Sequence, residues 1–166
     1  MKPNIILYIA TSLDGFIASK DLSVKWLDKY NKKGTDYGYK EFFRGINTVI
    51  VGNTTQKQFP QNYEGKPTFV FSRKEKGVKK NITYVKGSAK DFMKKYKPKG
   101  NIWLLGGAEI INHFLKDNLV GEMRLTVMPE LLGDGVRLFK KGNKEKMFKL
   151  IGKKSYGDVV ELHYKK

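Results

Sequence analysis

Two adjacent glycines in the second half of the chain stand where a phosphate group could bind. An apolar run at residues 102–105 precedes Gly106-Gly107, and an amphipathic segment begins at Ala108. Glycine lets the backbone approach a ligand closely, and the free N–H groups at a helix start attract anions. The pattern fits a phosphate-binding turn, and it fits a tight strand-to-helix turn without a ligand equally well.

Three other apolar runs end in small or polar residues that could contact the same ligand. They end at Ala10-Thr11, at Gly52 and at Ser72-Arg73. In α/β sheets, ligands bind at the carboxyl ends of the parallel strands. The set suits a dinucleotide, and an arginine after a strand can bind a 2′-phosphate, which points to NADP. The alternative for Arg73 is a solvated loop arginine.

The segments that would position these residues alternate between short apolar runs and amphipathic stretches. Buried strands are expected at residues 5–10, 48–51, 68–71, 82–85 and 102–105. Helices are expected at residues 23–30, 36–44, 88–96 and 108–115, with one more starting after Gly52. Residues 13–18 read as a loop that folds back over a pocket.

The last third of the chain has a different pattern. Met123, Leu125 and Val127 alternate with polar residues, which predicts a half-buried antiparallel strand. Residues 147–151 and 159–164 predict two more strands, joined as a hairpin. We therefore expect one α/β domain over residues 1–166, with helices on both faces of a mixed sheet. The sheet has about eight strands, is mostly parallel and has an antiparallel C-terminal edge.

Charge is the unusual feature of the composition. Thirty-three Lys and Arg against sixteen Asp and Glu give a net charge of +17, which raises the question of nucleic-acid binding. Lysine dominates, and its pairs are dispersed through probable loops and helix ends rather than interleaved with aromatic residues. We expect a solvated basic surface and no nucleic-acid partner.

The composition also excludes several kinds of chemistry. The chain has no cysteine, which excludes disulfides, thiolate nucleophiles and cysteine-ligated metals. It has only two histidines, well separated, so we expect no metal site. No apolar run approaches the ~20 residues of a membrane helix, and the start lacks a signal-peptide pattern. We expect a cytoplasmic protein.

Six segments in order along nearly the whole chain match a known pattern. They are S-L-D-G-F-I-A (12–18), D-Y-G-Y-K-E-F (36–42), I-N-T-V-I-V-G (46–52), P-T-F-V-F-S-R (67–73), W-L-L-G-G-A-E-I (103–110) and P-E-L-L-G-D-G-V-R-L-F (129–139). They resemble the dihydrofolate reductase-like superfamily, specifically stand-alone proteins similar to the C-terminal reductase domain of bacterial riboflavin biosynthesis. The resemblance implies a three-layer αβα sandwich and an NADPH-dependent reductase of 5-amino-6-(5-phosphoribosylamino)uracil or a related ribosyl-pyrimidine or pterin-like molecule.

The resemblance also implies where the cofactor binds. The nicotinamide would lie near Ala10 and the 14–17 loop, the 2′-phosphate end near the turn after Gly52 and Ser72-Arg73, and the pyrophosphate at residues 106–109. The implied cofactor-binding residues are Ala10, Ile17, Gly52, Asn53, Thr54, Thr55, Ser72, Arg73, Leu105, Gly106, Gly107, Ala108, Glu109 and Ile110.

One departure from the family pattern falls inside this set. After Gly52 the family usually has Arg-Lys-Thr, whereas this chain has Asn53-Thr54-Thr55. A basic contact to the cofactor phosphates is missing, for which Lys57 or Lys74 are the candidate replacements. Binding of NADPH is therefore a hypothesis, and a degenerate relative that binds a nucleotide without turnover is the alternative.

The candidates for proton transfer are three carboxylates. Asp14 would lie beside the nicotinamide, although an Asp before Gly commonly stabilises a turn. Asp36 and Glu41 lie on or beside the helix that carries the pterin-binding carboxylate in folate-reducing relatives, although Asp36 also suits an N-cap. Tyr37 and Tyr39 are candidates for the substrate pocket, with core packing as the alternative. The resemblance and the antiparallel edge strands favour a homodimer.

Overall fold

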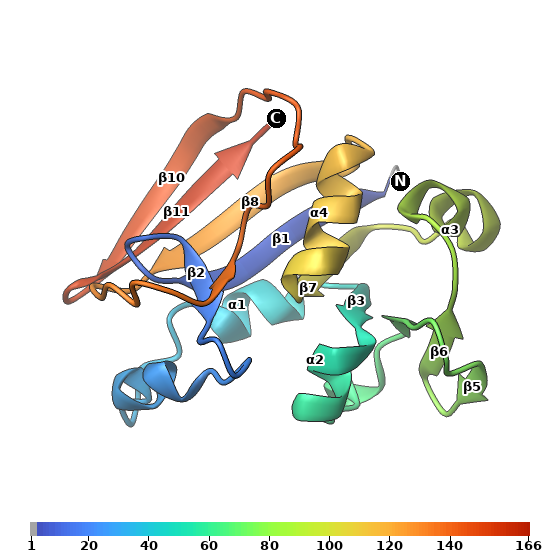
Figure 1. Cartoon of the computed structure of the whole chain (residues 1–166), viewed down its shortest axis with the longest axis horizontal. Helices are drawn as coiled ribbons and strands as arrows, with labels where there is room; N and C mark the ends of the chain where they lie inside the picture. The colour runs from blue at the N-terminus through green and yellow to red at the C-terminus, as the bar shows by residue number, and fades with distance from the viewer. Residues whose placement is uncertain (1–2) are drawn as a thin grey trace.

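A nine-stranded mixed sheet takes strands from both ends of the chain (Figure 1). The computed structural model describes residues 3–166. In sheet order the strands are β10 (Lys149–Tyr156), β11 (Val159–Lys165), β8 (Val120–Val127), β1 (Asn4–Thr11), β7 (Asn101–Gly106), β3 (Thr48–Gly52), β4 (Thr68–Phe71), β6 (Ile82–Val85) and β5 (Gly77–Lys79).

The six central strands, from β8 to β6, all run parallel, whereas β11 and β5 run antiparallel to their neighbours. The predicted mixed sheet with an antiparallel C-terminal edge is confirmed. The strand absent from the prediction is β5, whose three residues are all exposed. An exposed strand has no apolar pattern, so its pairing with β6 leaves no signal in the sequence.

Helices cover both faces of the sheet, as predicted (Figure 1). The helical segments are η1 (Lys25–Tyr30), α1 (Tyr39–Arg44), α2 (Asn53–Gln58), η2 (Tyr63–Gly65), α3 (Ala89–Tyr96) and α4 (Ala108–Lys116). Helix α3 begins at the predicted Ser88 cap, whose hydroxyl oxygen accepts the N–H of Asp91 at 3.1 Å. Helices η1 and α1 are shorter than predicted, because η1 is a 3₁₀ turn and α1 begins only after Gly38, a left-handed residue with φ +80°.

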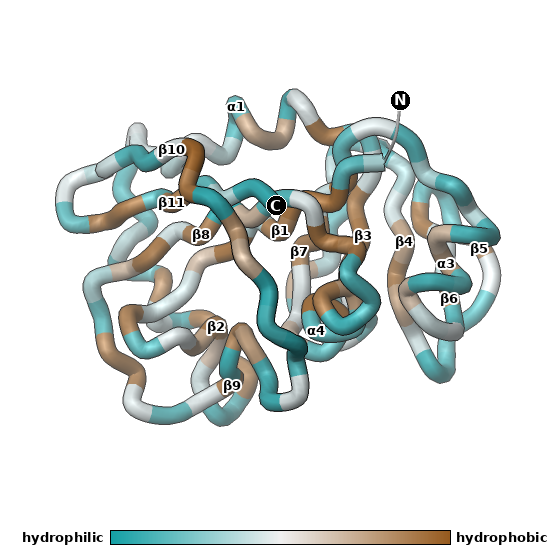
Figure 2. The backbone as a smooth tube through the Cα atoms, turned by 90° about the horizontal axis from the view of Figure 1, so that it is seen from above, coloured by the Kyte–Doolittle hydropathy of each residue, from teal (hydrophilic) through white to brown (hydrophobic). Residues whose placement is uncertain are grey.

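Alternate side chains of the central strands enter two separate cores. On one face, Ile5 and Leu7 of β1 pack in a cluster with the buried side of α4, including Phe114. On the other face, Ile6 packs with α1 around Trp103. In Figure 2 the hydrophobic segments follow the central strands and α4. Because each strand is buried on both faces, a shift of one residue in register would exchange the two cores.

The predictions for strand β8 and for residues 13–18 were wrong. Strand β8 is antiparallel only to β11, since it runs parallel to β1. Its polar residues Glu122 and Thr126 are buried on the face that the alternation assigned to solvent. Glu122 bonds to Asn4 and His163 of the neighbouring strands, and Arg124 on the same strand lies over Phe42 of α1. The expected loop at residues 13–18 contains β2 (Phe16–Ala18), which pairs with β9 (Val136–Arg137). A pairing over more than one hundred residues cannot be read from a local pattern.

Candidate functional site

The four strand ends singled out in the sequence lie in one row. Strands β1, β7, β3 and β4 are consecutive neighbours and parallel, so Thr11, Gly106, Gly52 and Phe71 end at the same edge of the sheet. The prediction that these ends meet is confirmed by the topology. An edge of this kind is where open α/β sheets bind their ligands.

The backbone turns after β3 and β7 lie in direct contact at this edge. A methyl group at Gly52 would lie 3.5 Å from the carbonyl oxygen of Gly106 and from the nitrogen of Gly107. A methyl group at Gly107 would lie 3.2 Å from Oγ1 of Thr55. Gly106 has a φ of +136°, which side-chain-bearing residues rarely adopt. A side chain would therefore fit at Gly52 in ordinary contact, whereas the backbone of Gly106 and the closeness of Thr55 to Gly107 disfavour one at those two positions.

Helix α4 begins directly at this turn, with Gly107 as its N-cap. Ala108 and Ile110 are buried in the core, so only their backbone groups are available to a ligand. The first N–H groups of a helix have no partner within it, and with the helix dipole they favour an anion. Glu109 is exposed in this first turn, where its negative charge would repel an anion bound at the helix start.

Ala10, Ile17 and Leu105 lie at the same edge but in different clusters. Ile17 packs in the α4 cluster, Leu105 in the Trp103 cluster and Ala10 against Trp26 and Met128. They line the carboxyl end of β1 and β7 from both faces of the sheet. Their roles in cofactor binding remain predictions.

A carboxylate that the sequence analysis did not single out joins the turns after β3 and β4. Glu75 Oε2 accepts a hydrogen bond from Asn53 Nδ2 at 2.7 Å and another from the Ser72 hydroxyl, and Glu75 Oε1 pairs with Lys57 Nζ. The Ser72 oxygen in turn accepts the N–H of Glu75 at 2.9 Å. Lys57 and the Ser72 hydroxyl lower the pKa of Glu75 to about 2. We call Asn53, Lys57, Ser72 and Glu75 the Glu75 cluster.

The other residues predicted for the phosphate end lie around this cluster. Arg73, Thr54 and Lys74 are exposed, and the N–H of Lys74 bonds to the Ser72 oxygen at 3.2 Å. Of the two candidate replacements for the missing basic contact, Lys57 is therefore already paired with a carboxylate. Arg73 and Lys74 both present exposed cations after β4.

Asp14 connects two loops beside β1. Its carboxylate accepts the Ser12 hydroxyl at 2.6 Å and the N–H groups of Leu132 and Gly133 at 3.1 and 2.7 Å. The Ser12 hydroxyl and then these two N–H groups hold the pKa of Asp14 below its ordinary value. A carboxyl that stays ionised is a poor proton donor at neutral pH, so the geometry favours the structural role that the Asp-Gly pair indicated.

Asp36 and Glu41 are also engaged elsewhere. Asp36 accepts the N–H groups of Gly38 and Lys40 at 3.2 and 3.0 Å, and these bonds keep its pKa low. It thus stabilises the start of α1 from two residues before Gly38, which is the N-cap, so the interpretation of Asp36 as the N-cap itself was wrong. Glu41 is exposed and pairs with Lys154 at 2.9 Å, and this partner lowers its pKa. These contacts disfavour both residues as proton donors at neutral pH.

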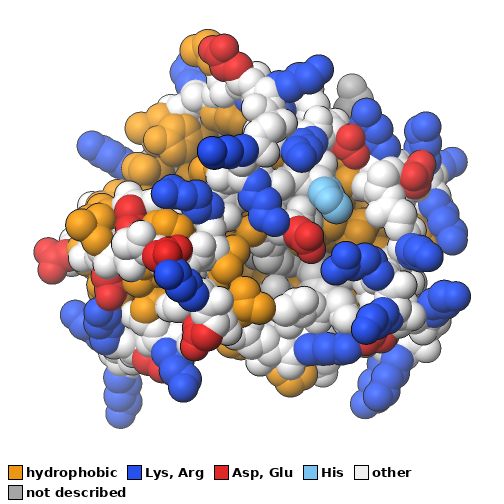
Figure 3. Space-filling model, viewed as in Figure 1, with side chains coloured by type: hydrophobic (Ala, Val, Ile, Leu, Met, Phe, Trp, Pro, Cys, Tyr) orange, Lys and Arg blue, Asp and Glu red, His pale blue; other side chains and the backbone are white. Residues whose placement is uncertain are grey.

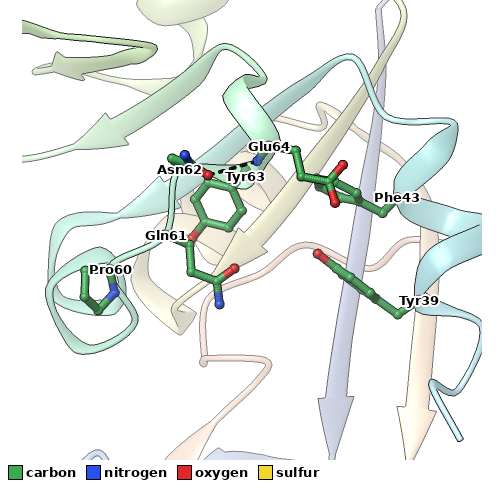
Figure 4. A pocket seen from close by; sticks show the side chains of 7 residues that line it. All are labelled: Tyr39, Phe43, Pro60, Gln61, Asn62, Tyr63 and Glu64. Atoms are coloured by element: carbon green, nitrogen blue, oxygen red, sulfur yellow. Dashed lines mark hydrogen bonds between the residues drawn. The ribbon is translucent and has the colours of Figure 1, made fainter. Parts of the chain in front are cut away.

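The two candidate substrate tyrosines line different cavities. Tyr39 and Phe43 of α1 line a cavity of about 450 Å³ with residues 60–64, which follow α2. In Figure 4 the Tyr39 hydroxyl and the Glu64 carboxylate point toward one another. Tyr37 lines a second cavity of about 370 Å³ beside the β10–β11 turn. Both volumes suit small molecules. The sequence did not predict that residues 60–64 line a cavity, because their approach to α1 depends on the tertiary fold.

A buried polar cluster beside Tyr37 was also missed. Glu161 of β11 is only 4% exposed, and no described residue bonds its Oε2 atom. Arg124 of β8 is its nearest cation, at 4.0 Å. Burial and the Glu161 charge raise the pKa of Tyr8, whose hydroxyl donates to the Tyr37 carbonyl oxygen at 3.2 Å. The only sign of this cluster in the sequence was the alternation of polar residues in β11, and this alternation is equally typical of a solvent-exposed face.

The charges are dispersed on the face drawn in Figure 3, where acidic side chains lie among Lys and Arg. Within residues 3–166, no helix is both long and apolar enough to span a bilayer.

The sheet, its two helical layers and the row of strand ends define an α/β protein of the dihydrofolate reductase-like fold. The family of the RibD C-terminal domain matches residues 3–162. The chain belongs to this family.

Its relatives include proteins of the same length. The uncharacterized protein YwjB of Bacillus subtilis (strain 168) is 37% identical over 174 residues, which cover 99% of this chain and 98% of YwjB. The uncharacterized protein YyaP of the same organism is 28% identical, with 96% and 93% coverage.

Solved structures show the same arrangement. A protein of Shewanella sp. PV-4, provisionally assigned to riboflavin biosynthesis, is 29% identical with a TM-score of 0.85 and 98% coverage of both chains. A diaminohydroxyphosphoribosylaminopyrimidine deaminase/5-amino-6-(5-phosphoribosylamino)uracil reductase of Thermotoga maritima has a TM-score of 0.76 at 14% identity. The match covers 99% of this chain and 56% of the Thermotoga chain, and its low identity supports the fold alone.

The contacts of Asp14 predict a pH-dependent loss of stability for Asp14→Asn. The pKa of Asp14 is lower in the folded chain than its ordinary 3.8, so its contribution is complete above that value and is lost as the pH falls through the folded pKa. Urea unfolding should show a less stable variant at pH 7 and a smaller difference at pH 3. Asp28→Asn, an exposed substitution in η1, is the control; equal effects of the two substitutions at pH 7 would contradict this role.

The pairing of buried Glu161 with half-buried Arg124 predicts that Arg124→Met destabilises the protein by about 2 kcal/mol, because Glu161 would lose the cation that lies 4.0 Å from it. Arg137→Met is the matched control, since both arginines lie over a phenylalanine ring but Arg137 is exposed. Adding Glu161→Gln to Arg124→Met should restore much of the loss in urea unfolding. Similar losses for the two arginine variants would show that Glu161 does not depend on Arg124.

Proposed function

We propose that the protein is an NADPH-dependent reductase that transfers hydride to a small ribosyl-pyrimidine or pterin-like substrate. The observation that carries this proposal is the row of strand ends, in which the Gly52 and Gly106-Gly107 turns meet at the start of α4. Membership of the RibD C-terminal domain family and the reductase named among the solved structures support it. The closest reaction by analogy is reduction of 5-amino-6-(5-phosphoribosylamino)uracil.

The residues at this edge fit the parts of a dinucleotide. Backbone N–H groups at Gly107 and the first turn of α4 would hold the pyrophosphate, and Ser72 and Arg73 would face the 2′-phosphate. Ala10 and Ile17 would contact the nicotinamide. Bound NADPH supplies the hydride, and the chain then contributes orientation and exclusion of water.

The cavity of Tyr39 and Glu64 is our candidate for the substrate site. It lies on the α1 face of the sheet, and Tyr39 packs in the same cluster as Leu105, next to the glycine turn. Tyr63 and Glu64, which line it, both have left-handed backbone angles, with φ of 47° and 51°. Strained residues of this kind are common at ligand sites.

A relative that binds the nucleotide without turnover is the second candidate. The engagement of Asp14, Asp36 and Glu41 in structural contacts favours it, because these were the candidate proton donors. Oxidation of NADPH in the presence of the aminouracil ribosyl phosphate distinguishes a reductase from a relative without turnover.

A nucleic-acid-binding protein is the third candidate, and it requires salt-sensitive retention of DNA or RNA at physiological salt. The proposed reductase is cytoplasmic.

We also propose a homodimer through strand β10. This strand forms the free edge of the sheet, and Met147 and Ile151 are 88% and 49% exposed at or beside it. Long edge strands with apolar side chains pair readily with another strand. A second copy of β10 in antiparallel orientation would bury both.

NADPH should stabilise the protein against thermal unfolding, because a ligand that binds only the folded state raises its stability. At a cofactor concentration of one hundred times the dissociation constant, the gain in the free energy of unfolding is about 2.7 kcal/mol.

Arg73→Ala should weaken the binding of NADPH about tenfold and that of NADH less than twofold, since only NADPH carries the 2′-phosphate that the arginine would pair with. No shift at millimolar cofactor would exclude both nucleotide-binding candidates, and equal losses for both cofactors would remove Arg73 from the 2′-phosphate.

Ile151→Lys should convert the dimer to a monomer, because it replaces an exposed apolar side chain of the pairing strand with a charge. Size-exclusion chromatography with light scattering measures the mass. Val78→Lys is the control, because Val78 is also an exposed β-branched apolar residue (72% exposed, against 49% for Ile151) but lies on β5, at the opposite edge of the sheet. A monomeric wild-type protein, or dissociation by both substitutions, would contradict an interface at β10.

A further inference from the structure

The Glu75 cluster lies where the proposed function requires an anion site. Asn53 directly follows Gly52, and Ser72 directly follows β4, so both stand at the phosphate end of the proposed dinucleotide site. Lys57 lies one turn further along α2. Together they offer an amide N–H, a hydroxyl and an ammonium group, which are donors suited to a phosphate.

In this structure these three donors are directed to the Glu75 carboxylate. Both carboxylate oxygens are used: Oε2 by Asn53 and Ser72, and Oε1 by Lys57. The N–H groups of Lys74 and Glu75 bond to the Ser72 oxygen and hold the turn that presents the carboxylate. The chain thus places its own anion among the donors that a phosphate would need.

A phosphate at this position would meet two obstacles. Its charge would be repelled by the nearby carboxylate, and the donors would first have to leave Glu75. A ribose 2′-hydroxyl meets neither obstacle, because it is neutral and can donate a hydrogen bond to a carboxylate. An acidic residue that accepts this hydroxyl is a general means of favouring the unphosphorylated dinucleotide.

We propose that Glu75 is the residue that sets cofactor preference, by occupying the donors of Asn53, Lys57 and Ser72 and thereby disfavouring a 2′-phosphorylated nucleotide relative to its unphosphorylated counterpart. The inference rests on the proposed function, because it concerns the same dinucleotide site. It assigns Arg73 and Glu75 opposite effects: Arg73 attracts the 2′-phosphate and Glu75 opposes it. The preference of the wild-type protein for NADPH over NADH is then small.

The test is the binding of NADPH and NADH to the full chain and to Glu75→Gln, measured by calorimetry. Removing the carboxylate charge should tighten NADPH about tenfold and change NADH by less than about threefold, since repulsion of the phosphate is lost and three donors are released. Glu75→Ala should act in the same direction, and it removes any dependence on how a glutamine amide fits. Thermal unfolding establishes that each variant is folded.

Asp117→Asn is the matched control. Asp117 pairs with Lys90 at 3.5 Å, and its side chain is 23% exposed, against 29% for Glu75. It lies at the C-terminal end of α4, at the opposite end of the helix from Gly107. Its loss changes the net charge by the same amount, so it should leave the ratio of the two dissociation constants unchanged.

The outcomes separate this inference from the proposed function. If both dinucleotides bind and Glu75→Gln and Glu75→Ala leave the ratio of their dissociation constants unchanged, Glu75 does not set the preference. The same conclusion follows if Asp117→Asn changes the ratio equally. If neither dinucleotide binds the wild-type protein or its variants, the proposed function fails. Titration with 2′-AMP and 5′-AMP then tests whether Glu75 by itself opposes the binding of a 2′-phosphate. Tighter binding of 2′-AMP by Glu75→Gln then supports the inference, and unchanged binding overturns it.

Discussion

Burial of the central strands on both faces is the constraint on which the rest of the structure depends. Ile5 and Leu7 enter the α4 core while Ile6 enters the Trp103 core, so β1 can pair with β7 in only one register without exposing apolar side chains. The same argument holds for β3. Because the registers are set, the ends of β1, β7, β3 and β4 lie in one row, and the site at their carboxyl edge is a consequence of core packing.

The phosphate end of this edge is decided by electrostatics rather than by packing. A single carboxylate, Glu75, orders the turns after β3 and β4 by accepting from Asn53, Ser72 and Lys57. An internal anion makes these turns stable without a ligand, in a chain that is otherwise strongly basic. The same contacts reduce the attraction of the site for an external phosphate. The contacts that stabilise these turns therefore oppose affinity for a phosphorylated cofactor at this position.

Much of the fold could be predicted because its signals are local. Apolar runs at residues 5–10, 48–51 and 102–105 became β1, β3 and β7, and Ser88 capped α3 as expected. The errors arose where partners are distant in sequence. Strand β2 pairs with β9, and the buried Glu122 of β8 bonds to Asn4 and His163, which are distant from it in the sequence. For the candidate site, the sequence indicated the glycine turns and Ser72-Arg73 but could not show what surrounds them.

By itself, then, the sequence determined the class of fold, the positions of most strands along the chain and the glycine turns at their ends, since periodicity and glycine act over a few residues. Only the tertiary structure decided which polar groups meet there. Tyr37 and Tyr39, two residues apart, face different cavities, and Asn53 and Glu75, twenty-two residues apart, share a hydrogen bond. The adjacent glycines Gly106-Gly107 were ambiguous in the sequence because a bare turn and a phosphate site look alike over ten residues. Their contact with Gly52 and Thr55 exists only in three dimensions, where Gly106 has a φ that disfavours a side chain and a Cβ at Gly107 would crowd Thr55.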